Sequence, residues 1–423
     1  MKNNRLNPRR RDFLGLVGSA TAASLLTAHA PGWAAAVSQR AAAAADRVLI
    51  LIELKGGNDG LNTVVPFADP GYAALRGSLA LKPDELLRLD GQAGLHGELE
   101  ALMPLWEREE LAIVQGVGYP HPNLSHFRSI EIWESASSAS ETLESGWVTR
   151  AMRAGYGAMP PVNGTAPPRD ALGGVSRFTA EGVLIGTNAF GSLAGARAVS
   201  LSNPDAFVSQ SRLASAMALT GNAALQHVLR VENHISQAAA GLGSDRFDFS
   251  TMFPTGGFGN AVRAAAQVVA SQRASVGTGR GGVPVITLSL GSFDTHQNQL
   301  ANHGALLRQL AQGVAALKSA LTELGAWDRT LVMTFSEFGR RARPNNSNGT
   351  DHGTAAPHFV AGGAVRGGLY GQAPDLARLD NLQNLIHTTD FRQLYSTIAR
   401  DWWGVGAFDV VRGSFEPLPF VRA

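Results

Sequence analysis

The sequence contains no cysteine among its 423 residues. Disulfide bonds, thiolate nucleophiles, zinc–thiolate sites and iron–sulfur clusters are therefore excluded. Any metal ion that this chain binds must be held by oxygen atoms and imidazole nitrogens, which suit zinc and the harder divalent ions.

Charge is scarce as well, because only 17% of the residues are charged and the net charge is +2. The first 36 residues hold five basic residues and one acid, a net +4, so the remainder carries about −2 (2 minus 4). We therefore expect no basic face and no nucleic-acid partner. Nucleotide binding is not indicated either, since "GGAVRGG" lacks a phosphate-loop lysine and "GGNDG" does not fit GxGxxG.

The N-terminus has the pattern of an export signal. A basic start leads into "RRDFL" at 10–14, and no Lys, Arg, Asp or Glu then follows until Arg40. Small residues at 28–30 and 34–36 offer cleavage sites. We interpret residues 1–36 as a twin-arginine signal peptide, which predicts a periplasmic or secreted protein that engages the twin-arginine export machinery. A permanent membrane anchor is the alternative, but Gly, Ser, Thr and Pro interrupt the run, so we expect none.

Four continuous apolar runs have the length of buried parallel strands, at 47–54, 111–118, 283–290 and 330–335. Leucines and other residues spaced three and four apart predict a long amphipathic helix over 299–324, and 96–110 also reads as a helix. Strand, helix and strand form a βαβ unit, so we predict an α/β fold with a largely parallel sheet. We expect residues 37–423 to form one domain, with a helical and loop-rich insertion at about 137–282 packed beside the sheet.

Ionisable and hydroxyl side chains follow each predicted strand. Asp59 follows the first run, Ser125, His126 and Arg128 follow the second, and Asp294 and His296 follow the third. Ligands bind beyond the carboxyl ends of parallel strands, so we expect these side chains at one edge of the sheet. Asp59 could instead make an Asx-turn, Ser125 could be only a helix N-cap, and Asp294 and His296 could form a structural hydrogen bond.

The fourth run is followed by Glu337 and then by Asp351 and His352. Glu337 is a candidate metal ligand, with an ion pair to Arg340 or Arg341 as the alternative. His352 and the adjacent Asp351 are candidate metal ligands. His303 lies on the apolar helix stripe and is interpreted as a core histidine.

Metal-assisted attack at phosphorus or sulfur is the chemistry that this pattern favours. Carboxylates and neutral imidazoles can hold one or two divalent ions, and ions of this kind stabilise the attacking and leaving oxygens. Ser125, at a helix start, could serve as the nucleophile or position a water. Arg128, one turn later, could clamp an oxyanion.

Six motifs resemble a bacterial family exported by the twin-arginine route, domain of unknown function 1501. They are "GGNDGLNTVVP", "NLSHFRS", "SFDTHQNQ", "SEFGRR", "GTDHGTAAPHFVAGG" and "TTDFRQLYSTIARDWWG", and together they extend across the mature chain. That family resembles the alkaline phosphatase and sulfatase superfamily. The resemblance implies an alkaline-phosphatase-like fold, in which helices sandwich a large central sheet.

The resemblance also implies roles for particular residues. Asp59 would match the metal ligand after the first strand, Ser125 the nucleophile, and Asp294 with His296 the ligands of one metal. His352 would match a late histidine ligand. The chain has Ser336-Glu337 where the superfamily usually has an Asp-His pair, and Asp294 and His296 are closer together than usual.

We therefore expect a metal-dependent hydrolase of phosphate or sulfate esters. Its cofactor would be one or two divalent ions (Zn, Mn, Ca or Mg), and its substrate a small-molecule or glycan ester. The alternative is a non-catalytic periplasmic binding or assembly protein that keeps the fold. A redox enzyme gains no support, because no redox cofactor motif is found.

Overall fold

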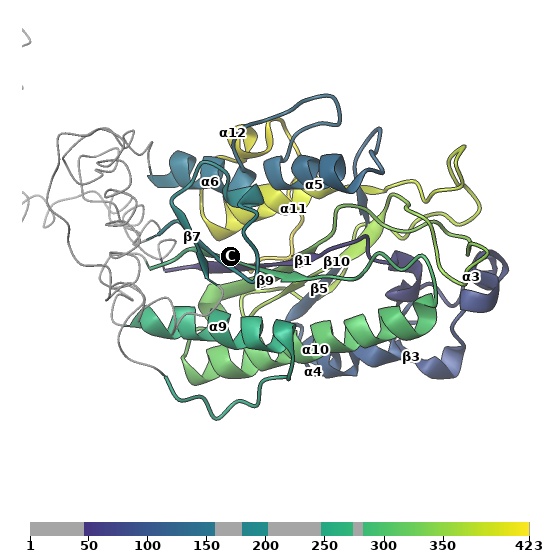
Figure 1. Cartoon of the computed structure of the whole chain (residues 1–423), viewed down its shortest axis with the longest axis horizontal. Helices are drawn as coiled ribbons and strands as arrows, with labels where there is room; N and C mark the ends of the chain where they lie inside the picture. The colour runs from purple at the N-terminus through teal and green to yellow at the C-terminus, as the bar shows by residue number, and fades with distance from the viewer. Residues whose placement is uncertain (1–45, 157–179, 202–246, 274–281, 423) are drawn as a thin grey trace, which may run out of the picture. The chain divides into compact units, whose positions relative to one another are not determined.

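In the computed structural model, which describes residues 46–156, 180–201, 247–273 and 282–422, nine strands form one central sheet. Helices cover both faces of this sheet (Figure 1). The predicted signal segment 1–36 and residues 211–240 of the predicted insertion lie outside the described residues. Within the described ranges, no helix is long and apolar enough to cross a membrane.

Eight strands follow one another across the sheet, and a ninth pairs at one side. Their spatial order is β11 (Gly368–Tyr370), β5 (Leu111–Gly118), β10 (Ala356–Ala361), β9 (Thr330–Phe335), β1 (Val48–Leu54), β8 (Val285–Leu290), β6 (Gly182–Ile185) and β7 (Ala198–Leu201), with β12 (Thr389–Asp390) paired to β5. A smaller sheet has the order β2 (Val64–Val65), β4 (Gly94–His96) and β3 (Leu86–Arg88).

The central sheet is largely parallel. β1 runs parallel to both β8 and β9, and β6 runs parallel to β8 and β7. β10 is antiparallel to β9 and to β5, so β5, β11 and β12 again run in the direction of β1. The predicted α/β class with a mostly parallel sheet is confirmed, and the four predicted strands correspond to β1, β5, β8 and β9.

Two layers of helices bury the two faces of the sheet (Figure 1). The helices are α3 (Pro70–Arg76), α4 (Met103–Glu107), α5 (His126–Ser135), α6 (Trp147–Tyr156), α9 (Gly257–Ser271), α10 (Gln299–Glu323), α11 (Phe391–Thr397) and α12 (Ala407–Val411). Ile50 and Ile52 of β1 join the core beneath α9 and α10, whereas Leu49 and Leu51 join the core beneath α5, α6 and α11. The continuous apolar run of β1 thus reflects burial on both faces.

Helix α10 carries the chain from β8 to β9, across β1, and confirms the predicted βαβ unit. Its stripe at Leu310, Val314 and Leu317 is buried against the sheet. His303 is also buried, and its Nε2 lies 2.9 Å from Asn58 Oδ1. Burial lowers the pKa of His303 to about 4, so it stays neutral, as expected for a core histidine.

The predicted helix over 96–110 differs from the structure. A 3-10 helix occupies Gly97–Leu102, and α4 begins only at Met103. Pro104 explains the difference, because proline has no N–H to donate back to Glu100 and fits only in the first turn of an α-helix.

The described parts of the segment 137–282 contain α6, β6, β7 and α9. β6 and β7 extend the central sheet beyond β8, and Val262 and Val269 of α9 are buried in the same core as α10. These parts therefore belong to the sheet and its helical layer and do not lie beside them.

Candidate metal centre

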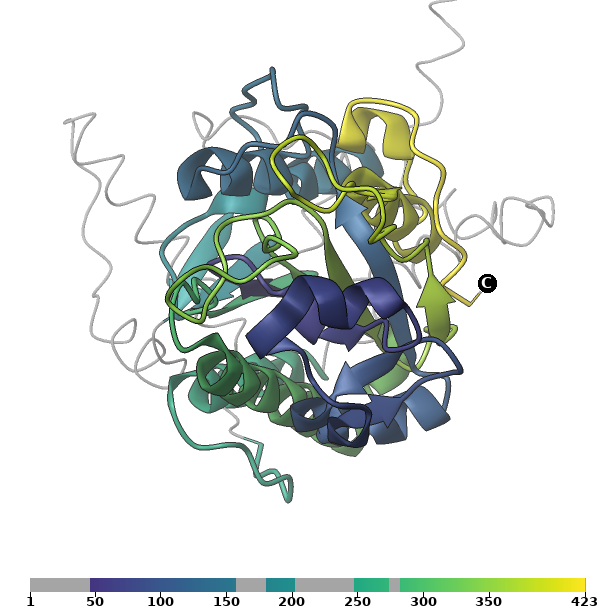
Figure 2. The same ribbon diagram turned by 90° about the vertical axis from the view of Figure 1, so that its right-hand side faces the viewer.

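Loops at one edge of the sheet carry the ionisable side chains. His126 starts α5 after β5, Asp294 follows β8, and Glu337 follows β9. His352 precedes β10, which is antiparallel, so its start lies at the same edge as the ends of its neighbours. These loops lie on the side of the sheet that faces the viewer in Figure 2.

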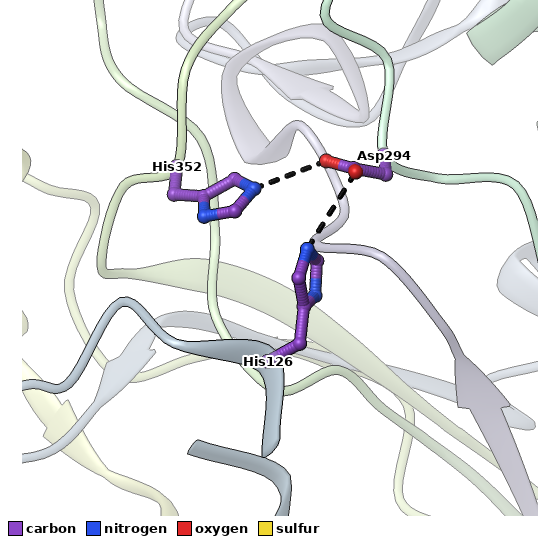
Figure 3. Close-up of side chains that lie close together, drawn as sticks. All are labelled: His126, Asp294 and His352. Atoms are coloured by element: carbon purple, nitrogen blue, oxygen red, sulfur yellow. Dashed lines mark hydrogen bonds and ion pairs between the residues drawn. The ribbon is translucent and has the colours of Figure 1, made fainter. Parts of the chain in front are cut away.

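Asp294 lies at the centre of a cluster of imidazoles (Figure 3). His352 Nε2 is 3.1 Å from Asp294 Oδ1, and His126 Nε2 is 3.5 Å from Asp294 Oδ2. His296 Nε2 is 3.0 Å from Asp294 Oδ1 and 3.1 Å from His352 Nε2. One ligand atom from each of His126, Asp294 and His352 lies within 4.8 Å of the others, which is close enough to share one ion.

Each imidazole turns its second nitrogen toward an oxygen. His352 Nδ1 donates to the carbonyl of Leu124 at 2.9 Å. His126 Nδ1 lies 2.8 Å from Glu337 Oε1, and His296 Nδ1 lies 3.4 Å from Asp351 Oδ1. Such an outer oxygen fixes the tautomer of a metal-binding histidine and leaves the inner nitrogen with a lone pair.

This arrangement gives the cluster an excess of acceptors. In the tautomer that has the outer nitrogen protonated, the inner nitrogens of His126 and His352 direct their lone pairs at the carboxylate of Asp294. Two acceptors at such distances repel each other unless a proton or a cation lies between them. Nitrogen and carboxylate donors of this kind suit Zn²⁺ and related divalent ions, so the residues fit a metal.

Arg340 fixes the position of Asp294. Its guanidinium is fully buried and donates to Asp294 Oδ1 at 2.5 Å, and also to the carbonyls of Gly56, Gly57 and Thr350. Partial burial works to raise the pKa of Asp294, but the hydrogen bond and charge of Arg340 outweigh it and lower the pKa below its usual value. Asp294 is therefore held as a carboxylate.

Two glycines allow the loops to approach this closely. A Cβ on Gly56, whose φ is 121°, would lie 2.3 Å from the backbone nitrogen of Asp294. A Cβ on Gly349 would lie 2.1 Å from the carbonyl carbon of His296. The glycine-rich sequences "GGNDG" and "NGTDHG" thus serve close backbone packing around the cluster.

Asp59 is not part of the cluster formed by the imidazoles. Its Oδ2 accepts from Arg76 and from Gln299, and its side chain is 1% exposed. Its Oδ1 is buried and has no hydrogen-bond partner among the described residues. Asp59 therefore forms a buried ion pair with Arg76 and makes no Asx-turn, and its role as a metal ligand stays a prediction.

Glu337 and Asp351 lie behind the imidazoles and not beside Asp294. Glu337 is 2% exposed, and its Oε1 also accepts from the backbone N–H of Gly56 at 2.9 Å. The alternative pairing of Glu337 with Arg340 or Arg341 is not found, because Arg340 pairs with Asp294 and Arg341 lies 3.9 Å from Asp351.

Ser125 is the N-cap residue of α5, but its hydroxyl caps no helix N–H, and the residue is exposed. The hydroxyl therefore has no hydrogen-bond partner among the described residues. Arg128 points elsewhere, since its Nη2 donates to the carbonyls of Ser138, Ala139 and Glu141 and its Nη1 pairs with Glu131 at 2.9 Å. Arg128, which was expected to clamp an oxyanion, therefore binds the backbone of the chain after α5 instead.

The sequence interpretation assigned no role in the site to three important residues. His126 was placed at the sheet edge together with Ser125, but it was not singled out as a ligand. Arg340 and Arg76 carried no such signal, because nothing local predicts that an arginine will be fully buried.

The comparisons with known proteins agree with the resemblance seen in the sequence. The chain belongs to the family described as protein of unknown function (DUF1501), whose pattern matches residues 175–404, more than half of the chain. The matched residues include Asp294, His296 and His352, whereas His126 lies before the match begins. A comparison with curated proteins gives no match.

Solved structures of the alkaline phosphatase and sulfatase type are similar at a low level. The phosphonate monoester hydrolase SpPMH from Silicibacter pomeroyi is 12% identical, with a TM-score of 0.38 over 88% of this chain and 75% of that chain. The zinc complex of the periplasmic domain of EcEptC from Escherichia coli is 10% identical, with a TM-score of 0.37 over 85% and 83%. A protein in the alkaline phosphatase superfamily from Vibrio parahaemolyticus is 10% identical, with a TM-score of 0.38 over 88% and 71%. Likenesses this weak carry no argument about activity.

Proposed function

We propose that this protein is an exported, metal-dependent hydrolase of phosphate or sulfate esters. One observation supports it most: three imidazoles turn one nitrogen toward Asp294 and the other toward an oxygen. With the outer nitrogens protonated, the inner lone pairs face a carboxylate, an arrangement that a bound cation would stabilise.

His126, Asp294 and His352 would hold one divalent ion, with His296 as a fourth ligand. An ion held there would polarise the ester and lower the pKa of a bound hydroxyl. Glu337 would orient His126, and Arg340 would keep Asp294 ionised and in place. The sequence predicts one or two ions, and this cluster would hold one of them.

The exposed hydroxyl of Ser125 would attack phosphorus or sulfur, or would position the attacking water. The bond from that atom to the ester oxygen breaks, and the ester oxygen takes a proton and leaves as the alcohol. If Ser125 is the nucleophile, its proton passes to the leaving ester oxygen, and one water then cleaves the bond between Ser125 and phosphorus or sulfur. This second step releases phosphate or sulfate and restores the hydroxyl; if water attacks directly, no such bond forms.

One observation favours the non-catalytic alternative. Arg128 is occupied by backbone carbonyls and Glu131, so it supplies no free cation to an oxyanion. A protein that binds a metal but lacks such a group could act in binding or assembly and not in catalysis.

Turnover of a panel of aryl phosphates, phosphodiesters and sulfates tests the proposal. We expect Ser125→Ala and His352→Ala each to abolish the activity of the wild type. Ser140→Ala, at another exposed serine, is the matched control and should keep it. A metal-loaded wild type that turns over no ester would favour the binding or assembly alternative.

Periplasmic or secreted localisation is a separate part of the proposal. It follows from the twin-arginine pattern at Arg10 and Arg11. We expect the double substitution Arg10→Lys and Arg11→Lys to leave the protein in the cytoplasm, as measured by cell fractionation. Unchanged export would contradict the twin-arginine route.

A further inference from the structure

A cavity of about 390 Å³ opens beside Asp294. It lies between the loop 291–298 and the first two turns of α10. We propose that this cavity binds the alcohol portion of the ester, and that this portion is uncharged and hydroxylated, as in a sugar or another polyol. The inference rests on the proposed function, since it assigns the part of the substrate that leaves.

Free polar groups line the cavity. Thr295 Oγ1 is engaged, because it donates to Gln299 at 3.0 Å. The hydroxyl of Ser292 and the amide of Gln297 have no hydrogen bond to any residue in the described ranges. Asn302 Nδ2 donates to the carbonyl of Gln297 at 3.3 Å, which leaves its Oδ1 open as an acceptor. Hydroxyl and amide groups both donate and accept, as recognition of an alcohol requires.

The remaining lining sets the charge and the shape of the ligand. Asp294 is the one ionisable side chain among the described residues that line the cavity. No lysine or arginine of those residues is present to balance a second anion, so a carboxylated or further phosphorylated alcohol is disfavoured. Ala305 and Leu306 add an apolar surface against which the carbon skeleton of a ring can pack.

The wall of the cavity is preformed. Ser292 and Asn298, at the two ends of the loop, have φ values of 77° and 48°, which residues other than glycine seldom adopt. The turn at 345–350 holds the loop in this shape: Asn345 Nδ2 donates to His296 O at 2.9 Å, and Thr350 N donates to Thr295 O at 3.2 Å. A rigid polar wall loses little entropy when a ligand binds.

Two pairs of esters test the inference. Glucose 6-phosphate is compared with cyclohexyl phosphate, and glucose 6-sulfate with cyclohexyl sulfate, so that each pair shares one charged group and differs in hydroxyls. Kcat/KM is measured if the purified wild type turns the esters over, and Kd by calorimetry if it does not. We expect the glucose ester to be favoured about tenfold in at least one pair, since one or two neutral hydrogen bonds give an advantage of that size.

Substitutions assign that advantage to the cavity. We expect Gln297→Leu and Asn302→Leu each to reduce the preference to less than about threefold, with little change for the cyclohexyl ester. Gln312→Leu, an exposed glutamine farther along α10, is the matched control and should keep the full preference.

The outcomes separate this inference from the proposed function. Glucose esters that bind with the expected preference but are never hydrolysed would support the cavity and contradict catalysis. Esters that are hydrolysed without preference, or with a preference that survives Asn302→Leu, would overturn the cavity inference and leave the hydrolase standing. A wild type that binds neither glucose ester would also overturn it.

Discussion

Two aspartates that follow neighbouring strands have opposite environments. Asp59 follows β1 and Asp294 follows β8, and each accepts a hydrogen bond from a fully buried arginine. Asp59 is 1% exposed and has Gln299 as its second partner, whereas Asp294 is 43% exposed and faces His126, His296 and His352. The one is sealed inside the protein, and the other is open to ligands.

The difference shows what a strand-end aspartate needs in order to do chemistry. Position at the carboxyl edge is common to both residues, and so is the arginine. What differs is the set of side chains that adjacent loops bring to the carboxylate. We therefore expect substitution of Asp294 to change metal binding and substitution of Asp59 to change stability.

The largest expected effect is that of Asp294→Asn on metal affinity. Loss of an outer hydrogen-bond partner of a metal ligand typically costs 10–100-fold, so loss of a carboxylate ligand should cost at least about 1,000-fold. Competition with a chromophoric chelator measures the affinity for Zn²⁺. An affinity equal to that of the wild type would show that Asp294 is not a ligand.

The second prediction concerns Asp59→Asn, which leaves the Arg76 charge buried without its partner. Breaking a buried ion pair in this way costs about 3–5 kcal/mol of unfolding free energy. Denaturant unfolding measures the loss, and metal affinity should stay within about threefold of the wild type.

A double variant provides the control for that prediction. Removing both charges in Asp59→Asn with Arg76→Met should recover much of the lost stability, because no unpaired charge remains. Additive losses would contradict the account of Asp59 as the partner of Arg76.

The third prediction concerns Glu337→Gln, which keeps the shape but removes the charge behind His126. We expect metal affinity to fall about 10–100-fold, as is usual for an outer partner of a histidine ligand. The same chelator competition measures it. A loss as large as that of Asp294→Asn would instead make Glu337 a direct ligand.

The last prediction concerns a dependence of stability on pH at Glu134, in α5. Burial and the nearby charge of Glu53 raise the pKa of Glu134 to about 8. The folded protein therefore holds a proton on Glu134 that the unfolded chain loses above about pH 4.5. The stability that this proton provides declines as the pH rises toward 8. The unfolding free energy of Glu134→Gln should therefore rise relative to that of the wild type between pH 5 and 8, by up to about 1.4 kcal/mol per pH unit.

Denaturant unfolding at several pH values measures this effect. Glu131→Gln is the matched control on the same helix, because Glu131 is 39% exposed and paired with Arg128. A constant difference between Glu134→Gln and the wild type across this range would contradict a proton held at Glu134.

Much of the fold could be predicted because its signals are local. The apolar runs marked β1, β5, β8 and β9, and the spacing of leucines marked α10. The prediction of one helix over 96–110 was wrong, because Pro104 can lie only in the first turn of an α-helix. β6 and β7 are four residues each and carry too little pattern to be recognised.

The site was less predictable, because it depends on pairings between distant residues. The strand-end rule brought Asp294, His296 and His352 to one edge, and the structure groups these three side chains. The same rule could not distinguish the buried Asp59 from the exposed Asp294, because its partner Arg76 lies in α3 and nothing local predicts the burial of this pair. It also could not tell that Glu337 would lie behind His126 and not beside Asp294.

Anomalous diffraction at the metal edge, from crystals of the purified protein, tests the central claim most directly. We expect one peak about 2.0–2.2 Å from His126 Nε2, His352 Nε2 and a carboxylate oxygen of Asp294, the usual distances for zinc with such ligands. No peak in a fully folded protein, or a peak at Asp59 instead, would contradict the claim that the open cluster around Asp294 is the metal centre.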